Sequence, residues 1–242
     1  MNGKDLSPDF PYYRGAPVWI SGKEWLVPLA AVALAGWILL VRLPIFSQGS
    51  WQAVPSLLLV ILPLAGLALV AGRHWTALFR HVAWKDIGWM FGFALLNYAI
   101  AIPLGFAAVN LIEAERNAGI ASMAEADVGL QALFFAISIP QLIGEELISI
   151  IPFLALLYLL DHKLRFPRRT AIIAAWLITA VWFAAIHLPT YNWNILQCLI
   201  VIGSARLVLT LAYLKTKNLW VSAGAHIIND WTTFAIVLVG TG

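Results

Sequence analysis

The chain has 242 residues, of which 62% are hydrophobic and only 11% are charged. Soluble globular domains carry about 45–50% apolar and about 25% charged residues, so too few polar side chains remain here to cover a water-facing surface. The net charge is only +3, and the sequence contains no nucleic-acid motif, so we expect no nucleic-acid partner. The single cysteine, Cys198, excludes an intramolecular disulfide and a cysteine-based metal cluster. Composition therefore predicts an integral membrane protein.

A polar N-terminal segment precedes several apolar stretches of membrane-spanning length. Residues 1–24 lack the apolar core and cleavage site of a signal peptide, and we interpret them as an N-terminal cytoplasmic segment. The apolar stretches, each of about 20 residues, are 25–46, 51–71, 87–112, 129–160, 170–188, 194–214 and 219–239. Internal Gly and Pro residues are typical of membrane helices, where neighbouring helices satisfy the freed backbone groups. The sequence predicts an all-α membrane protein with about seven transmembrane helices, in which residues 25–242 form a single multispan domain.

The loops between these stretches alternate in charge. The loops after the second, fourth and sixth stretches are basic, whereas the loops between them are neutral or acidic. The basic residues are Arg73, Arg80, Lys85, Lys163, Arg165, Arg168, Arg169, Lys215 and Lys217. Since positively charged loops stay on the cytoplasmic side, we expect the N-terminus inside and the C-terminus outside. The expected location is the cell membrane, as a multi-pass protein in contact with lipid.

Ionisable side chains within the apolar stretches are the candidate functional residues. Each is costly at membrane depth unless it is paired or faces a cavity. With one neighbouring amide they come from four stretches: Glu145, Glu146, His187, Arg206, His226, Asn229 and Asp230. The alternative is a purely structural ion-pair network that holds the helices together. We favour a functional site, because such a network gains little from two adjacent glutamates in lipid.

Helical spacing assigns these residues to faces. His226 and Asp230 are four residues apart and share one face of their helix. Glu145 and Glu146 are neighbours and diverge by about 100° around the helix axis. We therefore expect one glutamate to face a reaction cavity and the other to turn toward a partner.

Three short patterns resemble the motifs of a known family. Glu145-Glu146, Phe183-xxx-His187 and His226-xxx-Asp230 are similar to the three motifs of the CAAX protease and bacteriocin-processing (CPBP) family, which includes the type II CAAX prenyl endopeptidase. The resemblance covers about residues 129–239. It implies an intramembrane endopeptidase that hydrolyses a peptide bond by glutamate-activated water, in peptide maturation or bacteriocin self-immunity. The partner it implies is a peptide or membrane-protein substrate.

The resemblance also implies roles for individual residues. Glu145 is the expected general base, and His187 is expected to help hold the water. His226 and Asp230 are expected to stabilise the oxyanion, for which an imidazole N–H is a suitable donor. Supporting residues are Glu146, Phe183, Arg206 and Asn229.

Two positions depart from the family pattern. Ile150 stands where the first motif usually ends in Arg, and Asp230 stands where the third motif often ends in Asn. An ionised Asp cannot donate a hydrogen bond, so Asp230 must be protonated or must orient His226. We expect Arg206, about midway through its stretch, to supply the charge that Ile150 lacks. Glu146 is its expected partner, and Asp230 is the rival.

Two alternatives stay open, and one expectation about depth accompanies them. Two histidines and a glutamate are a possible zinc ligand set, but no His-Glu-x-x-His-like pair exists and we expect no metal or other cofactor. A non-enzymatic membrane immunity factor, or a proton-coupled carrier that uses Glu145 and His226, is the competing class of function. Straight helices also place His187 nearer the outer face than His226, by on the order of 10 Å.

Overall fold

The chain folds as a helical bundle. The computed structural model describes residues 9–41, 43–46, 49–112, 114–115 and 117–241. The longer helices are α1 (Leu26–Val41), α2 (Val54–Ala71), α3 (Trp84–Leu111), α5 (Val128–Leu157), α6 (Arg168–Ile186), α8 (Ser204–Thr216) and α9 (Leu219–Thr241), and the short ones are α4 (Ala118–Ala124) and α7 (Ile195–Gln197). Short 3₁₀ segments cover Pro44–Phe46, Gly49–Ala53, Gly72–Leu78 and Leu188–Tyr191, and π-helical turns cover Tyr158–Lys163 and Cys198–Gly203. No strand occurs in these described ranges, so the all-α prediction is confirmed.

Five helical segments are long and apolar enough to cross a membrane. They are Trp51–Leu78, Trp84–Leu111, Val128–Lys163, Arg168–Ile186 and Ile195–Thr216. The first predicted stretch is shorter than expected, because α1 has only 16 residues and covers about 24 Å at 1.5 Å per residue. Helix α9 occupies the seventh predicted stretch but is not among the five. An all-helical fold with five candidate membrane-spanning helices is confirmed in the described ranges, whereas the number of spans and their orientation stay predictions.

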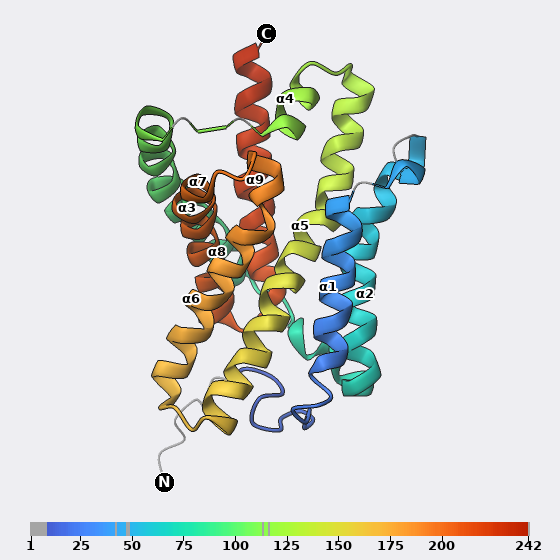
Figure 1. The fold of residues 1–242 in the computed structure, drawn as a ribbon, viewed down its shortest axis with the longest axis vertical. Coiled ribbons are helices and arrows are strands. Elements are labelled where there is room, and N and C mark those ends of the chain that lie inside the picture. The colour runs from blue at the N-terminus through green and yellow to red at the C-terminus, as the bar shows by residue number, and fades with distance from the viewer. Residues whose placement is uncertain (1–8, 42, 47–48, 113, 116, 242) are drawn as a thin grey trace.

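Helix α5 lies at the centre of the bundle (Figure 1). Helices α1 and α2 lie side by side and pack against α5 on one flank. On the other flank α6 and α9 contact α5, and α3 packs against α8 and α9. The chain from Asp9 to Glu24 crosses one end of the bundle, and the last turn of α9 lies at the other end (Figure 1).

Two glycines permit close helix packing beside the predicted motifs. A Cβ on Gly144 would lie 2.7 Å from Leu59 Cγ, so α2 approaches α5 one residue before Glu145. A Cβ on Gly224 would lie 2.5 Å from Met90 Sδ, so α3 approaches α9 two residues before His226. In both helices the motif therefore follows a point of close contact with a neighbour.

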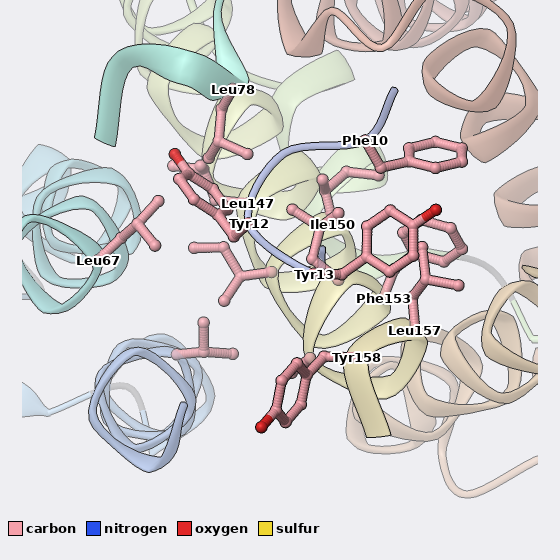
Figure 2. Close-up of a cluster of buried hydrophobic side chains, with 14 of the residues drawn as sticks. Phe10, Tyr12, Tyr13, Leu67, Leu78, Leu147, Ile150, Phe153, Leu157 and Tyr158 are labelled. Carbon is pink, nitrogen blue, oxygen red and sulfur yellow. The ribbon is translucent and has the colours of Figure 1, made fainter. Parts of the chain in front are cut away.

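The N-terminal segment is part of the core. Phe10, Tyr12 and Tyr13 are buried, and Figure 2 shows their side chains among those of α2, α5 and the turn after α2. The Phe10 ring lies 5.5 Å from the ring of Phe153 in α5, and the Tyr12 hydroxyl donates to the backbone oxygen of His74 at 2.8 Å. Residues 1–8 of the predicted N-terminal segment lie outside the described ranges. The described remainder packs across one end of the bundle.

Candidate active site

Arg206 of α8 forms a bidentate ion pair with Glu146 of α5. Its Nη1 and Nη2 donate to Glu146 Oε1 and Oε2 at 2.6 and 2.9 Å, and both side chains are 0% exposed. Nε donates to Thr210 Oγ1 at 3.1 Å, and the guanidinium carbon lies 5.1 Å from the centre of the Phe183 ring. The structure thus shows the pairing that we expected from the sequence, and the rival carboxylate of Asp230 is not the partner of Arg206.

Ile150, one turn after Glu146, lies in the apolar cluster at the end of the bundle. Its side chain is fully buried beside the aromatic residues of the N-terminal segment (Figure 2). A guanidinium at this position would have no aqueous surroundings. In this chain the cation that neutralises Glu146 therefore comes from another helix.

His226 of α9 lies between three carboxylates. Its Nδ1 is 2.9 Å from Glu146 Oε1, and its Nε2 is 3.8 Å from both Glu145 Oε2 and Asp230 Oδ2. An ionised carboxylate only accepts hydrogen bonds, so the Arg206-paired Glu146 requires the proton of the ring to be on Nδ1. Nε2 is left to face Glu145 and Asp230.

Glu145 has surroundings very different from those of its neighbour. Gln141 Nε2, one turn earlier in α5, donates to its Oε1 at 3.1 Å. No arginine or lysine is paired with it in the described ranges, and the residue is buried with 8% exposure. Both glutamates therefore approach His226, but from opposite sides of its ring, and only Glu146 is also paired with an arginine.

Asp230 is held by an amide chain that leads to α3. Asn229 Nδ2 donates to Asp230 Oδ1 at 2.9 Å, and Asn97 Nδ2 donates to Asn229 Oδ1 at 3.1 Å. The Tyr98 hydroxyl also donates to the backbone oxygen of Asn229. Sequence analysis missed Asn97 and Tyr98, although an asparagine in the middle of the apolar stretch 87–112 was a usable signal.

His187 lies at the carboxyl end of α6 and is half-buried. Its Nδ1 is 2.8 Å from the backbone oxygen of Phe183, and the two rings lie 4.5 Å apart. No hydrogen bond or ion pair in the described part of the chain joins His187 to Glu145, His226 or Asp230. The structure therefore brings Glu145, His226 and Asp230 together and leaves His187 at the margin of this cluster.

Proline in α5 links the site to α6. Pro152 has no backbone N–H, so the carbonyl of Ile148 loses its usual helical partner. Trp182 Nε1 of α6 donates to that carbonyl at 3.3 Å. Trp182 precedes Phe183, and this contact therefore fixes the end of α6 that carries Phe183 and His187 beside α5.

Within the described ranges, no three His, Cys, Asp or Glu side chains are arranged to hold a metal ion. The ring nitrogen of His226 that faces Glu146 already has that carboxylate as its partner. The expectation that the protein needs no metal stays a prediction, which chelation decides.

The comparisons with known proteins agree with the family resemblance predicted from the three motifs. Residues 127–232 match the family described as type II CAAX prenyl endopeptidase Rce1-like. The matched segment contains every predicted site residue from Glu145 to Asp230, so the family resemblance is confirmed over this segment. This family consists of membrane-embedded CAAX-type proteases. Neither the search of curated proteins nor the search of solved structures gave a match.

Proposed function

We propose that this protein is an intramembrane endopeptidase in which Glu145 activates water for attack on a peptide bond. The observation that supports this most directly is the split between the two glutamates. Glu146 is neutralised by Arg206, whereas Glu145 has no arginine or lysine partner in the described ranges, and its Oε2 lies 3.8 Å from His226 Nε2. A carboxylate in this position can accept a proton from a water that attacks a carbonyl.

The separation of Glu145 and His226 suits a bridging water. At 3.8 Å the two atoms are too far apart for a direct hydrogen bond, and polar groups at such distances are commonly bridged by one water. Glu145 would take the proton of this water, and Gln141 would keep the carboxylate oriented through its hydrogen bond to Oε1.

His226 would stabilise the oxyanion of the tetrahedral intermediate. Because Nδ1 already donates to Glu146, Nε2 can donate only when the ring carries both protons. The carboxylates of Glu145 and Asp230 near Nε2 supply negative charge for that doubly protonated ring. In this proposal Asp230 positions and balances His226 rather than donating a hydrogen bond itself.

His187 would accept a hydrogen bond from the attacking water. Its Nδ1 is adjacent to the Phe183 carbonyl, which can only accept, so the neutral ring carries its proton on Nδ1. Nε2 is then an acceptor. Closure of the remaining gap to Glu145 would have to occur when substrate binds, since catalytic contacts often tighten only in the complex.

The substrate would be a peptide or membrane protein cleaved within or near the bilayer, and peptide maturation and bacteriocin self-immunity are both compatible roles. The family description names prenylated substrates, so a test needs farnesylated peptides ending in Cys-aliphatic-aliphatic-X as well as unmodified membrane peptides.

The experiment uses full-length protein in liposomes with a pool of such peptides. Mass spectrometry would find new peptide termini with the wild type and none with Glu145→Gln. The matched control is Glu125→Gln, which changes an exposed glutamate of the same kind and should cleave like the wild type. No cleavage of any peptide by a folded wild type, or equal cleavage by Glu145→Gln, would contradict the proposal and favour a non-enzymatic immunity factor or carrier.

A further inference from the structure

A cavity lined by several basic residues lies away from the candidate active site, at the end of the bundle that carries the basic loops. It has a volume of about 440 Å³ and lies between the chain before α3, the first turns of α3 and the connection from α8 to α9. The side chains that matter for its chemistry are Arg80, Lys85, Trp89, Lys215, Lys217 and Asn218. None of the predicted catalytic residues lines it.

The cavity carries an excess of positive charge. Four of its lining residues are basic and one, Asp86, is acidic. The Asp86 carboxylate is already engaged, because its Oδ2 accepts from the backbone N–H of Ala83 at 2.9 Å at the start of α3. No ion pair in the described ranges involves any of the four basic residues.

Three of these four cations contact neutral groups instead of carboxylates. Lys215 Nζ lies 5.2 Å from the centre of the Trp89 ring, and Lys217 Nζ lies 5.3 Å from that of Phe10. Arg80 Nη2 donates to the backbone oxygen of Asp9 at 3.1 Å. The side chains are thus oriented, but their charge is not neutralised.

The state of Lys217 agrees with uncompensated charge. Burial lowers its pKa below the ordinary value, and the nearby cations Arg168, Arg80 and Lys215 add to this effect against the opposing influence of Asp9. An anion in the cavity would relieve this repulsion. The lysine lies in the connection between α8 and α9, outside the spanning segments.

A buried side chain builds the wall of the cavity. Asn218 Oδ1 accepts from the backbone N–H of Arg80 at 3.0 Å, and its Nδ2 donates to the backbone oxygen of Arg80 at 3.2 Å. This reciprocal pair joins two segments that are 138 residues apart in the sequence. The two backbone segments that carry Arg80 and Lys217 are therefore held together in advance of any ligand, which lowers the entropic cost of binding.

We propose that this cavity binds the phosphate group of an anionic ligand. Lysine and arginine are the usual phosphate-binding side chains, and basic pockets between membrane helices bind anionic lipid headgroups. Trp89 lines the cavity and is 40% exposed, and the exposed Trp84 and Trp220 lie one and two residues from the lining residues Lys85 and Asn218 in the sequence. Indoles concentrate at the depth of lipid headgroups. We therefore favour an anionic phospholipid as the ligand that carries the phosphate, and a soluble phosphate is the second candidate.

The test measures thermal unfolding of purified full-length protein in an uncharged detergent. One series adds dioleoylphosphatidylglycerol, a second adds zwitterionic dioleoylphosphatidylcholine, and a third adds inorganic phosphate. Binding to the folded state raises the unfolding temperature with ligand concentration and so gives an apparent affinity. The variant is Lys85→Gln combined with Lys215→Gln, and the control is Arg165→Gln combined with Arg169→Gln. All four side chains are exposed, so both double variants should fold.

We expect phosphatidylglycerol to stabilise the wild type and the control, and to bind the Lys85/Lys215 variant about thirtyfold more weakly. Protection by inorganic phosphate with the same dependence on the lysines would support the site and identify the ligand as soluble. Equal affinity of both double variants for every anion, or equal protection by phosphatidylcholine, would overturn the proposal. Its success or failure does not depend on protease activity.

Discussion

The ion pairs Glu146–Arg206 and Asp9–Arg168 both join a carboxylate to a guanidinium, but they differ strongly in their exposure to solvent. Glu146 and Arg206 lie in the interior with 0% exposure on both sides. Asp9 and Arg168 lie at the end of the bundle, where Nη2 is 2.5 Å from Oδ1 and the side chains are 41% and 40% exposed. The distances are similar, but water can replace a lost partner only in the second pair. Contact length alone therefore does not rank these interactions, because desolvation decides how much free energy is lost when one partner is removed.

The largest effect is expected from breaking the interior pair. Arg206→Leu would leave the Glu146 carboxylate buried without a cation and should lower the free energy of unfolding by about 3–5 kcal/mol. Unfolding in mixed detergent micelles measures this. The double variant Arg206→Leu with Glu146→Gln leaves no unpaired charge on this pair and should recover part of the loss. A loss below about 1 kcal/mol in the single variant, as for an exposed pair, would show that water reaches Glu146.

The exposed Asp9–Arg168 pair is adjacent to a buried aromatic residue, Phe10. Phe10→Ala removes a buried ring that contacts Phe153 at 5.5 Å and Tyr213 at 6.0 Å between ring centres. We expect a loss of about 3 kcal/mol, the lower part of the range for buried phenylalanines, because the segment can partly relax at the bundle end. The same unfolding assay applies. A loss near zero would mean that the N-terminal segment does not pack against α5.

The close approach of α2 to α5 provides an intermediate effect. Gly144→Ala places a methyl group 2.7 Å from Leu59 Cγ and should cost about 1–3 kcal/mol by overpacking. Gly92→Ala in α3 is the matched control, since a Cβ there meets nothing within 4 Å. The control should be neutral or slightly stabilising, because alanine favours helix. Equal effects in the two variants would argue against tight packing ahead of Glu145.

The smallest effect is expected at Asp9. Burial raises its pKa, but hydrogen bonds from Tyr13 and the Phe10 N–H together with Arg168 outweigh burial and hold the pKa below the ordinary 3.8. The stabilisation is therefore present above about pH 4 and is lost as the pH falls through the lowered pKa. Asp9→Asn should cost at most about 1 kcal/mol at neutral pH, since the pair is exposed. Unfolding measured from pH 6 to pH 2 should show a shallower acid limb for the variant, and an unchanged limb would contradict this.

The interior site was predictable from local sequence more fully than the end of the bundle. Charged residues in apolar stretches identified Glu146 and Arg206, and their pairing follows because a buried guanidinium requires a counter-charge. Helical spacing also predicted that Glu145 and Glu146 point in different directions, and only Glu146 reaches Arg206, although both contact His226. These inferences rest on membrane depth and helix geometry, both of which act over a few residues.

What the sequence did not reveal depends on contacts between distant segments. Residues 9–24 look like a polar tail, yet Tyr12 and Tyr13 are fully buried against helices far along the chain. The π-helical turn Cys198–Gly203 before Arg206 has no marker in composition. The role of Asn97 in holding Asn229 depends on the packing of α3 against α9, which periodicity within either helix cannot indicate.

Parallel assays of Glu145→Gln and Glu146→Gln test whether the two adjacent glutamates have different functions. The peptide-cleavage rate is measured at a temperature at which Glu145→Gln is folded, with unfolding temperatures recorded for both variants. We predict that Glu145→Gln keeps its unfolding temperature and loses about 10²–10⁴-fold in rate, as expected for a general base, while Glu146→Gln is strongly destabilised by the unpaired Arg206. A folded Glu145→Gln protein that cleaves at the wild-type rate would contradict the account.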